Sequence, residues 1–351
     1  MGHGQLQGYL DGLASLGGAA SALEAIVTDG GRTLFRHAAG FRVGGETLAA
    51  ASGARFDVAS LTKPWMATLA ILLDRDRTLA LATRIGDLEA GACAAAARTT
   101  LEDLLRHRSG IGCWAPLWVA VGGRFDDRLA LGSFLLTEGL WERRGDIPLY
   151  SDLGYLLWGL LVERVTGRAL AELLDARVAA PLGLPPVGAL AAAPPFPVEC
   201  RLDNGREVEL AREQGIEIAP QAPFLLGRPQ DGNARRLGFL AAHAGLFLTA
   251  DELLALGREW LAPGRLLATA EVERALAGDG EYALGWARQS ASGSSGPALS
   301  PGAFGHTGFT GGSLWIDRAA GRIHLLLAQR LSSRQEFNAV RREFHRLAAA
   351  L

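Results

Sequence analysis

Lysine is nearly absent from this chain of 351 residues. Of its 35 Lys and Arg side chains, 34 are arginine, and the single lysine is Lys63. A surface position that needs only a charge tolerates arginine in place of lysine. A position whose side chain must release a proton does not, because guanidinium stays charged at any practical pH. Lys63 is therefore a candidate for proton transfer, and a lysine left on the surface by chance is the plainer interpretation.

Metal-site cysteines, long apolar runs and a basic excess are missing as well. The three cysteines lie far apart and have neither the spacing of a zinc site nor that of a disulfide framework. No apolar run reaches about 18 residues, so we expect no membrane span. The net charge of −2 disfavours nucleic acid as a partner. The N-terminus lacks a basic segment followed by an apolar one, so we expect no signal peptide and a cytoplasmic location.

What the chain does contain is enough apolar sequence for a large core, since 49% of its residues are hydrophobic and 21% are charged. Residue patterns predict strands at 22–28, 33–41, 313–317 and 322–329, and helices at 5–17, 60–75, 99–108, 129–138, 152–166, 250–261 and 333–351. Nine of the 15 prolines lie at 181–229, which predicts a mostly irregular stretch, and the composition of 289–302 predicts a flexible loop. This order indicates an α+β fold in a single domain. We expect a sheet subdomain from 1–59 and 245–351 and a mainly helical subdomain from 60–244.

Ser60 lies three residues before Lys63, where a helical pattern begins. Pro64 suits the first turn of that helix, so we expect Ser60 at or near its N-cap and Lys63 one turn further on the same face. A serine hydroxyl becomes a strong nucleophile when a neighbour accepts its proton, and a lysine amine can do so if burial lowers its pKa. The N–H groups of a helix N-terminus favour a developing oxyanion. The plainer interpretation is a capping serine beside a solvated lysine.

Two further segments combine residue types that are common in catalytic sites. Residues 148–155, Pro-Leu-Tyr-Ser-Asp-Leu-Gly-Tyr, lead into a predicted helix and contain two of the four tyrosines. Residues 304–313, Phe-Gly-His-Thr-Gly-Phe-Thr-Gly-Gly-Ser, contain four glycines, which let a substrate or another backbone approach closely. Taken singly, the first is more simply a helix cap with a packed aromatic, and the second the glycine-rich entry to a hairpin.

Together the three segments resemble the serine β-lactamase and penicillin-binding-protein superfamily, and most closely its branch of class C β-lactamases, D-aminopeptidases and family VIII esterases. Ser60-Leu61-Thr62-Lys63 matches the Ser-x-x-Lys motif, Tyr150-Ser151-Asp152 matches Tyr-x-Asn except at its last position, and His306-Thr307-Gly308 matches the third motif in its histidine form. The similarity covers nearly the whole chain. It implies a β-lactamase/transpeptidase-like fold, an antiparallel sheet flanked by helices with an inserted, mostly helical subdomain, and neither metal nor organic cofactor.

The resemblance also implies roles for single residues. Ser60 is the expected acylated nucleophile, Lys63 takes its proton, and Tyr150, its pKa lowered by nearby positive charge, passes a proton to the leaving group. The backbone N–H groups of Ser60 and Phe309 are the expected oxyanion hole. Four residues are expected to bind the substrate: Asp152, His306, Thr307 and Gly308.

Two of these residues depart from the pattern of the superfamily. Asp152 replaces an asparagine, and an ionised carboxylate accepts hydrogen bonds but cannot donate them. It would hold Lys63 charged or cap the helix that begins there. His306 replaces a lysine, which weakens the fixed positive charge expected to hold a substrate carboxylate. Both changes argue against efficient β-lactamase activity.

Other residues in similar segments have more ordinary expected roles. For His107 and His243 we expect packing or hydrogen bonding rather than catalysis. Residues 231–233 would border the cleft or form a surface turn, with equal weight. Three tryptophans are more often core residues than the lining of an acyl pocket: Trp114, Trp118 and Trp141.

The sequence thus predicts a serine hydrolase that acts through an acyl-enzyme on small-molecule esters or amides. A D-amino-acid peptidase or carboxypeptidase, and an acyltransferase in which an alcohol or amine replaces water, are alternatives within the same chemistry. A non-catalytic binding protein that retains the fold is the alternative of another class. The sequence defines neither the acyl group nor the oligomeric state.

Overall fold

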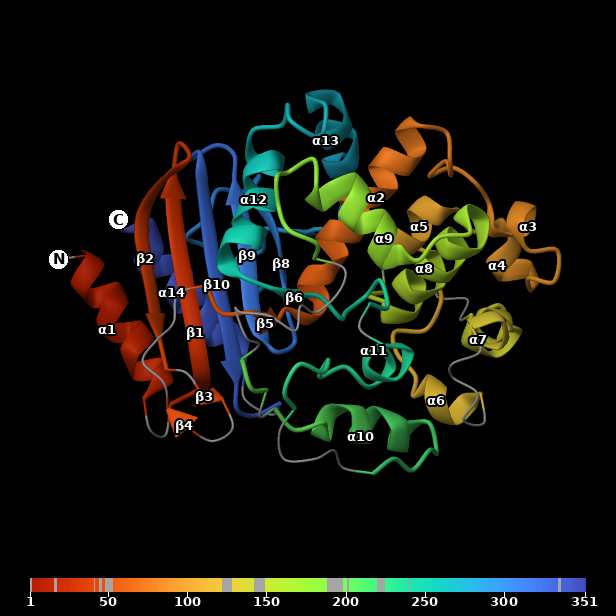
Figure 1. Cartoon of the computed structure of the whole chain (residues 1–351), viewed down its shortest axis with the longest axis horizontal. Coiled ribbons are helices and arrows are strands. Elements are labelled where there is room, and N and C mark those ends of the chain that lie inside the picture. The colour runs from red at the N-terminus through yellow and green to blue at the C-terminus, as the bar shows by residue number, and fades with distance from the viewer. Residues whose placement is uncertain are drawn as a thin grey trace.

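The computed structural model describes residues 2–15, 18–40, 42–43, 46–47, 53–121, 128–141, 149–187, 198–200, 202–219, 225–238, 240–333 and 336–351. Figure 1 shows a sheet with helices on both of its faces at the left, next to a group of helices at the right. Both termini lie on the sheet side. Among the helices described, none combines the length and the apolar composition needed to cross a membrane.

The main sheet is antiparallel and joins the two ends of the chain. Its order is β2-β1-β10-β9-β8-β7. The strands are β1 (Ala20–Asp29), β2 (Arg32–Ala39), β7 (Ala287–Arg288), β8 (Phe304–Thr307), β9 (Gly311–Asp317) and β10 (Arg322–Arg330). β1 pairs with β10 along its whole length, from Ala20 opposite Arg330 to Asp29 opposite Arg322. The four predicted strands are confirmed, with ends that differ by at most two residues, and residue 41 lies outside the described residues.

Both faces of the sheet are buried. Leu23 and Val27 of β1 belong to the core under α1 (Gly2–Ala14) and α14 (Phe337–Ala349), whereas Ala22 and Ile26 belong to the core on the opposite face. This alternation follows from the period of two in a strand. On the opposite face, α12 (Ala250–Leu261) packs against β1, β9 and β10.

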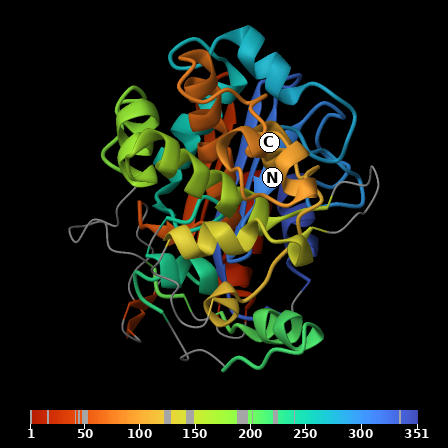
Figure 2. The same cartoon turned by 90° about the vertical axis from the view of Figure 1, so that its right-hand side faces the viewer.

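The middle of the chain is mainly helical. Figure 2 shows these helices in front of the strands. They are α2 (Thr62–Arg75), α3 (Ile85–Leu88), α4 (Ala94–Arg98), α5 (Leu101–Leu105), α6 (Leu117–Ala120), α7 (Arg128–Leu135), α8 (Asp152–Thr166), α9 (Leu170–Leu174), α10 (Gly205–Glu213) and α11 (Gly232–Leu237), with α13 (Thr269–Leu276) later in the chain. Short two-stranded pairs join β3 (Arg42–Val43) to β4 (Glu46–Thr47) and β5 (Phe56–Asp57) to β6 (Phe247–Leu248). The division into two subdomains at residues 60 and 245 stays a prediction.

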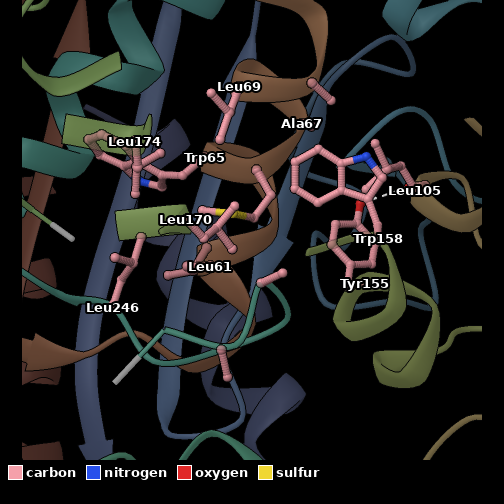
Figure 3. Packing of buried hydrophobic residues seen from close by; sticks show 14 of the residues in the cluster. Leu61, Trp65, Ala67, Leu69, Leu105, Tyr155, Trp158, Leu170, Leu174 and Leu246 are labelled. Carbon is pink, nitrogen blue, oxygen red and sulfur yellow. Dashed lines mark hydrogen bonds between the residues drawn. The ribbon is translucent and has the colours of Figure 1, made fainter. Parts of the chain in front are cut away.

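Helix α2 lies at the centre of the core, and every residue from Thr62 to Leu73 is buried. Figure 3 shows Trp65 beside Leu174 of α9 on one side of α2, and Trp158 and Tyr155 of α8 on the other side. Burying an aromatic side chain of this size stabilises the fold by up to about 3 kcal/mol. The packing therefore fixes the N-terminal end of α2, where Ser60 and Lys63 lie.

The helix predicted at 99–108 spans Leu101–Leu105 and so begins two residues later than expected. A capping box of Thr100 and Asp103 opens it. The Thr100 hydroxyl accepts a hydrogen bond from the Asp103 N–H at 3.1 Å. Thr99 instead ends the preceding helix, because its hydroxyl donates to the carbonyl of Ala95 at 3.0 Å.

Other boundaries also differ from the prediction. The first helix spans 2–14 rather than 5–17, the last begins at Phe337 rather than 333, and α7 ends at Leu135, before a 3-10 turn at Glu138–Leu140. The stretch at 181–229 is not wholly irregular, since α10 lies within it between proline clusters. The predictions for α8 and α12 match at both ends. Residues 289–302 contain neither helix nor strand.

Candidate active site

Ser60 is presented by a strained turn between β5 and α2. Ala59, the residue before it, has a φ of 45°, in the left-handed region that side chains with a Cβ rarely adopt. The N–H of Ala59 donates to the Asp57 carboxylate at 3.0 Å, and the other oxygen of this carboxylate accepts from the N–H of Gln230 at 2.7 Å. Burial raises the pKa of Asp57 to about 6. A buried carboxylate therefore holds the turn that exposes Ser60.

Ser60 directly precedes the N-cap residue of α2, so the prediction that it lies at or near that cap is confirmed. Leu61 is the N-cap residue, and a 3-10 helix at Ala59–Leu61 precedes α2. The Ser60 hydroxyl accepts a hydrogen bond from Lys63 Nζ at 2.8 Å. The side chain is thus left available for chemistry rather than used to satisfy the helix terminus.

Lys63 is fully buried and has three hydrogen-bond partners. Its Nζ lies 2.8 Å from Ser60 Oγ, 2.7 Å from Asp152 Oδ1 and 3.2 Å from the carbonyl oxygen of His243. An ammonium can donate to all three. A neutral amine can donate to Asp152 and His243 while its lone pair accepts the Ser60 proton. The same geometry therefore satisfies Lys63 in either protonation state.

Asp152 and Lys63 form an ion pair at 2.7 Å, in which the Asp152 side chain is 21% exposed and that of Lys63 is not exposed. Burial lowers the pKa of Lys63 below its usual value, and the charge of Asp152 opposes this effect. Asp152 does not cap α8, because the hydroxyl of Ser151 accepts from the N–H of Gly154 at 3.0 Å and fills that role.

Tyr150 lies over the same centre, and Lys63 Nζ is 4.8 Å from the centroid of its ring. The pKa of Tyr150 was expected to be lowered, and this expectation was wrong. Burial raises it well above its usual value, and the nearby charge of Asp152 raises it further, whereas a hydrogen bond with Ser60 lowers it. Tyr150 is therefore a neutral phenol with a strongly held proton.

The two histidines have the packing and hydrogen-bonding roles expected of them. His107 stacks on Tyr150 with ring centroids 4.4 Å apart, and its Nδ1 accepts the N–H of Ser151 at 2.9 Å. His243 Nε2 lies 2.9 Å from Asp231 Oδ1, and its Nδ1 lies 2.9 Å from the carbonyl oxygen of Ala241. Burial lowers the pKa of His243, but Asp231 outweighs this effect and raises it above its usual value. His243 is thus fixed with its own carbonyl directed at Lys63.

The loop after β8 lies against the turn that carries Ser60. A Cβ on Gly308 would lie 2.4 Å from the carbonyl oxygen of Val58, so only glycine allows this approach. The Thr310 hydroxyl donates to the carbonyl of Asp57 at 2.7 Å. These contacts bring Phe309, between Gly308 and Thr310, next to Ser60. Within the part of the chain that the structure describes, the backbone N–H groups of Phe309 and Ser60 have no acceptor.

Ser60 opens onto a cleft of about 490 Å³. Of the predicted substrate residues, Asp152, Thr307 and Gly308 line it together with Tyr150 and Phe309. His306 does not line the cleft. It is 4% exposed, and its Nδ1 lies 2.8 Å from the carbonyl oxygen of Thr307. Burial, together with the charge of Lys63, lowers the pKa of His306 to about 3, so it supplies no positive charge.

Several residues of the cleft were missed from the sequence. Arg330 at the end of β10, Arg341 on α14, and Arg206 and Glu207 on α10 all line the cleft. None of them belongs to a local sequence motif, because the tertiary fold brings each one to the cleft from a distant segment. Two residues with an uncertain role in the sequence, Asp231 and Trp114, line the cleft. Trp141 is instead a core residue, whose buried side chain donates to the carbonyl of Leu135 at 2.9 Å.

Metal ligands do not gather in the part of the chain that is described. No group of three or more His, Cys, Asp or Glu side chains is placed to hold a metal ion there.

Comparison with known proteins is consistent with this geometry. Residues 9–349 match the family model described as Beta-lactamase. Esterase EstB of Burkholderia gladioli is 31% identical over 268 residues, which cover 66% of this chain and 63% of that protein. The N-acetylmuramyl-L-alanine amidase of Bacillus subtilis (strain 168) is 29% identical over 239 residues, 62% of this chain and 53% of that protein. The matches thus span less than two thirds of the length of these curated relatives.

Among solved structures, the hydrolase EstCE1, described as having promiscuous acyltransferase activity, superimposes with a TM-score of 0.74. The superposition covers 98% of both chains at 18% sequence identity. This likeness shows the β-lactamase/transpeptidase-like fold.

Proposed function

The chain belongs to the Beta-lactamase family, and from that membership and the site geometry we propose that it is a serine hydrolase acting through an acyl-enzyme on Ser60. The observation that carries the proposal is the hydrogen-bonded series Ser60–Lys63–Asp152, which opens onto the cleft. A nucleophile, a base within hydrogen-bond reach and a third group that orients the base form the arrangement of an activated serine.

Acylation begins with a proton shift along the 2.8 Å bond between Ser60 and Lys63. The neutral Lys63 amine takes the hydroxyl proton while Ser60 Oγ forms a bond to the carbonyl carbon of the substrate. The resulting ammonium lies against Asp152, which stabilises it. The negative oxygen of the tetrahedral intermediate accepts hydrogen bonds from the N–H groups of Ser60 and Phe309.

Tyr150 completes the proposed cycle as a proton donor. Because its pKa is raised, its phenol keeps a proton at neutral pH and can give it to the leaving oxygen or nitrogen as the bond to carbon breaks. The Lys63 ammonium then returns a proton to the phenolate. Attack of water on the acyl-Ser60 ester by the reverse sequence of proton transfers releases the acid and restores the site.

The proposed substrates are small-molecule esters or small amides. The curated relatives include proteins named as an esterase and an amidase. Neutral His306 and the engaged carboxylate of Asp152 weigh against efficient turnover of β-lactams. The net charge of −2 weighs against nucleic acid. A cytoplasmic location is part of the proposal, and cell fractionation tests it.

Hydrolysis of an ester, p-nitrophenyl butyrate, and of the corresponding amide, butyryl p-nitroanilide, tests the function. Both substrates are given to the wild-type protein and to Ser60→Ala. Removal of the nucleophile should lower kcat by about 10⁴-fold or more. The matched control is Ser133→Ala, which alters an exposed serine on α7 and should hydrolyse both substrates at the wild-type rate. Full activity of Ser60→Ala would refute the proposal, and retention of binding without turnover in the wild type would favour a binding protein.

A further inference from the structure

The carbonyl of Gly308 accepts a hydrogen bond from Arg341 Nη2 at 2.6 Å. This carbonyl belongs to the same peptide unit as the N–H of Phe309. Arg341 lies on α14, is 6% exposed, and donates through Nη1 to Asn338 Oδ1 at 2.7 Å. A guanidinium therefore holds one end of the peptide whose other end is the expected oxyanion donor.

The backbone already fixes the orientation of this peptide without Arg341. The N–H of Gly311 donates to the Gly308 carbonyl at 3.0 Å and closes a tight turn. The close approach of Gly308 to Val58 and the bond from the Thr310 hydroxyl to Asp57 hold the turn against the segment before Ser60. The distinctive contribution of Arg341 is consequently its charge.

That charge has no partner of opposite sign among the ion pairs of the described residues. Glu336, the acidic residue that most affects Arg341, makes its ion pair with Arg342 at 3.2 Å. Burial, and then the charge of Arg330, lower the pKa of Arg341 to about 9, so it remains charged at neutral pH. A buried cation without a carboxylate is costly in the resting protein, and a nearby negative charge relieves that cost.

We propose that Arg341 is a positioning residue of the oxyanion hole: its guanidinium polarises the Gly308–Phe309 peptide, and its charge favours the tetrahedral intermediate over the bound ester. A charge-assisted bond to a carbonyl oxygen draws electrons toward that oxygen and makes the N–H at the other end a stronger donor. The guanidinium field adds to this when the substrate oxygen becomes negative. The inference rests on the proposed function, because it requires the Phe309 N–H to receive that oxygen.

Arg341→Met, which removes the charge while keeping the length of the side chain, tests the inference with an uncharged ester such as p-nitrophenyl butyrate. We expect kcat to fall about 10–100-fold with KM nearly unchanged, because an intact oxyanion donor is worth about 10²–10³-fold and Arg341 acts only through it. The inhibition constant of a boronic acid, whose tetrahedral adduct places an oxygen in the same position, should rise by a similar factor.

Two variants complete the design. Arg341→Gln keeps a donor for the Gly308 carbonyl and removes the charge, so it should lose activity as well, and it carries the test if the methionine variant does not fold. The matched control is Arg342→Met on the same helix, whose guanidinium pairs with Glu336 and donates to the carbonyls of Ser292 and Gly293. It should keep the wild-type kcat.

An ester of the same acyl group with an added carboxylate separates this role from direct contact, since Arg341 also lines the cleft. Loss confined to the KM of the anionic ester, with the uncharged ester unaffected, would overturn the inference. So would a fall in kcat without a fall in boronic acid affinity. Labelling of Ser60 by a fluorophosphonate in every variant keeps this test apart from the proposed function, because that function requires Ser60 to be labelled in the wild type whatever the Arg341 variants do.

Discussion

Ser60 and Ser313 each lie within hydrogen-bonding distance of a buried basic side chain. Ser60 Oγ is 2.8 Å from Lys63 Nζ, and Ser313 Oγ is 3.2 Å from His345 Nε2, between β9 and α14. Ser60 lines a cleft, whereas Ser313 and His345 have no exposed surface and line none of the described pockets. A serine beside a base is therefore not by itself a reactive site.

The two pairs also differ in the charges around the base. Lys63 has the carboxylate of Asp152 at 2.7 Å, which stabilises an ammonium once a proton arrives. His345 stacks on His324 with ring centroids 5.6 Å apart, and Nδ1 of both rings is buried without a partner in the part of the chain that is described. Burial lowers the pKa of His345 well below its usual value, so this base stays neutral. A nearby carboxylate distinguishes a base that can take a proton from one that only packs.

The largest difference in kcat should appear between variants of the two bases, Lys63 and His345. Lys63→Met removes the proton acceptor of Ser60 and should lower kcat by about 10²–10⁴-fold. Lys63→Arg should be about as inactive, because guanidinium cannot serve as the base. His345→Gln should leave kcat within about 2-fold, since His345 lies outside the cleft. Steady-state kinetics on an uncharged ester decide this, and a loss of kcat in His345→Gln as large as that in Lys63→Met would break the comparison.

Acidification should destabilise the fold in part through the histidine pair. Burial, and then Arg322, lower the pKa of His324 to about 4, from about 6.5 in an unfolded chain. The folded state therefore binds fewer protons than the unfolded state, and stability present above pH 6.5 is lost as the pH falls toward 4. The shift corresponds to about 3 kcal/mol in the free energy of unfolding.

Urea titrations of the wild type and His324→Phe across this pH range measure that contribution. The difference between the two free energies of unfolding should change by about 3 kcal/mol between pH 7 and pH 4, with the phenylalanine variant the less sensitive to acid. Parallel curves for the two proteins would show that His324 does not contribute to the acid sensitivity.

Asp152→Asn tests whether this carboxylate controls the pKa of Lys63. Loss of the carboxylate should lower the pKa of Lys63 further, by about 1 unit or more, because an opposite charge at this distance commonly shifts a pKa by about 1–3 units. The neutral amine then persists to lower pH, so the acid limb of the kcat/KM profile should move to lower pH. A limb that stays in place or moves upward would mean that Asp152 does not control the proton on Lys63.

Ser313→Ala should have the smallest effect. It removes one hydrogen bond of 3.2 Å to His345 and should change the free energy of unfolding by about 1 kcal/mol. Ester hydrolysis should remain at the wild-type rate. Thermal melting and one kinetic assay suffice, and a marked loss of hydrolysis would show that the buried pair communicates with the cleft.

Local sequence explains why part of this structure could be predicted. Ser60 and Lys63 are one helical turn apart across the junction of the 3-10 helix and α2, so their proximity follows from local helical geometry. The helix α8 was predicted correctly at both ends, because Ser151 caps its start and Gly167, with a φ of 65°, ends it. Similarly, the four glycines of 304–313 indicated a close approach by a substrate or another backbone, and at Gly308 the neighbour is the backbone of Val58.

The rest of the site depends on distant segments. The carbonyl of His243 reaches Lys63 across 180 positions of the sequence, and Arg341 reaches Gly308 across 33. The predicted direction of the pKa shift of Tyr150 was wrong because burial and the charge of Asp152 raise this pKa and outweigh the hydrogen bond with Ser60, and burial is a property of the assembled core. The left-handed conformation of Ala59, the residue before Ser60, had no signal in the sequence.

Intact-mass spectrometry after treatment with a fluorophosphonate tests the central claim most directly. The wild type and Ser313→Ala should each gain the mass of one adduct, and Ser60→Ala should gain none, because among the serines that the structure describes only Ser60 combines a hydrogen-bonded base with access to the cleft. Labelling of Ser60→Ala, or a folded wild type that stays unmodified, would contradict the account.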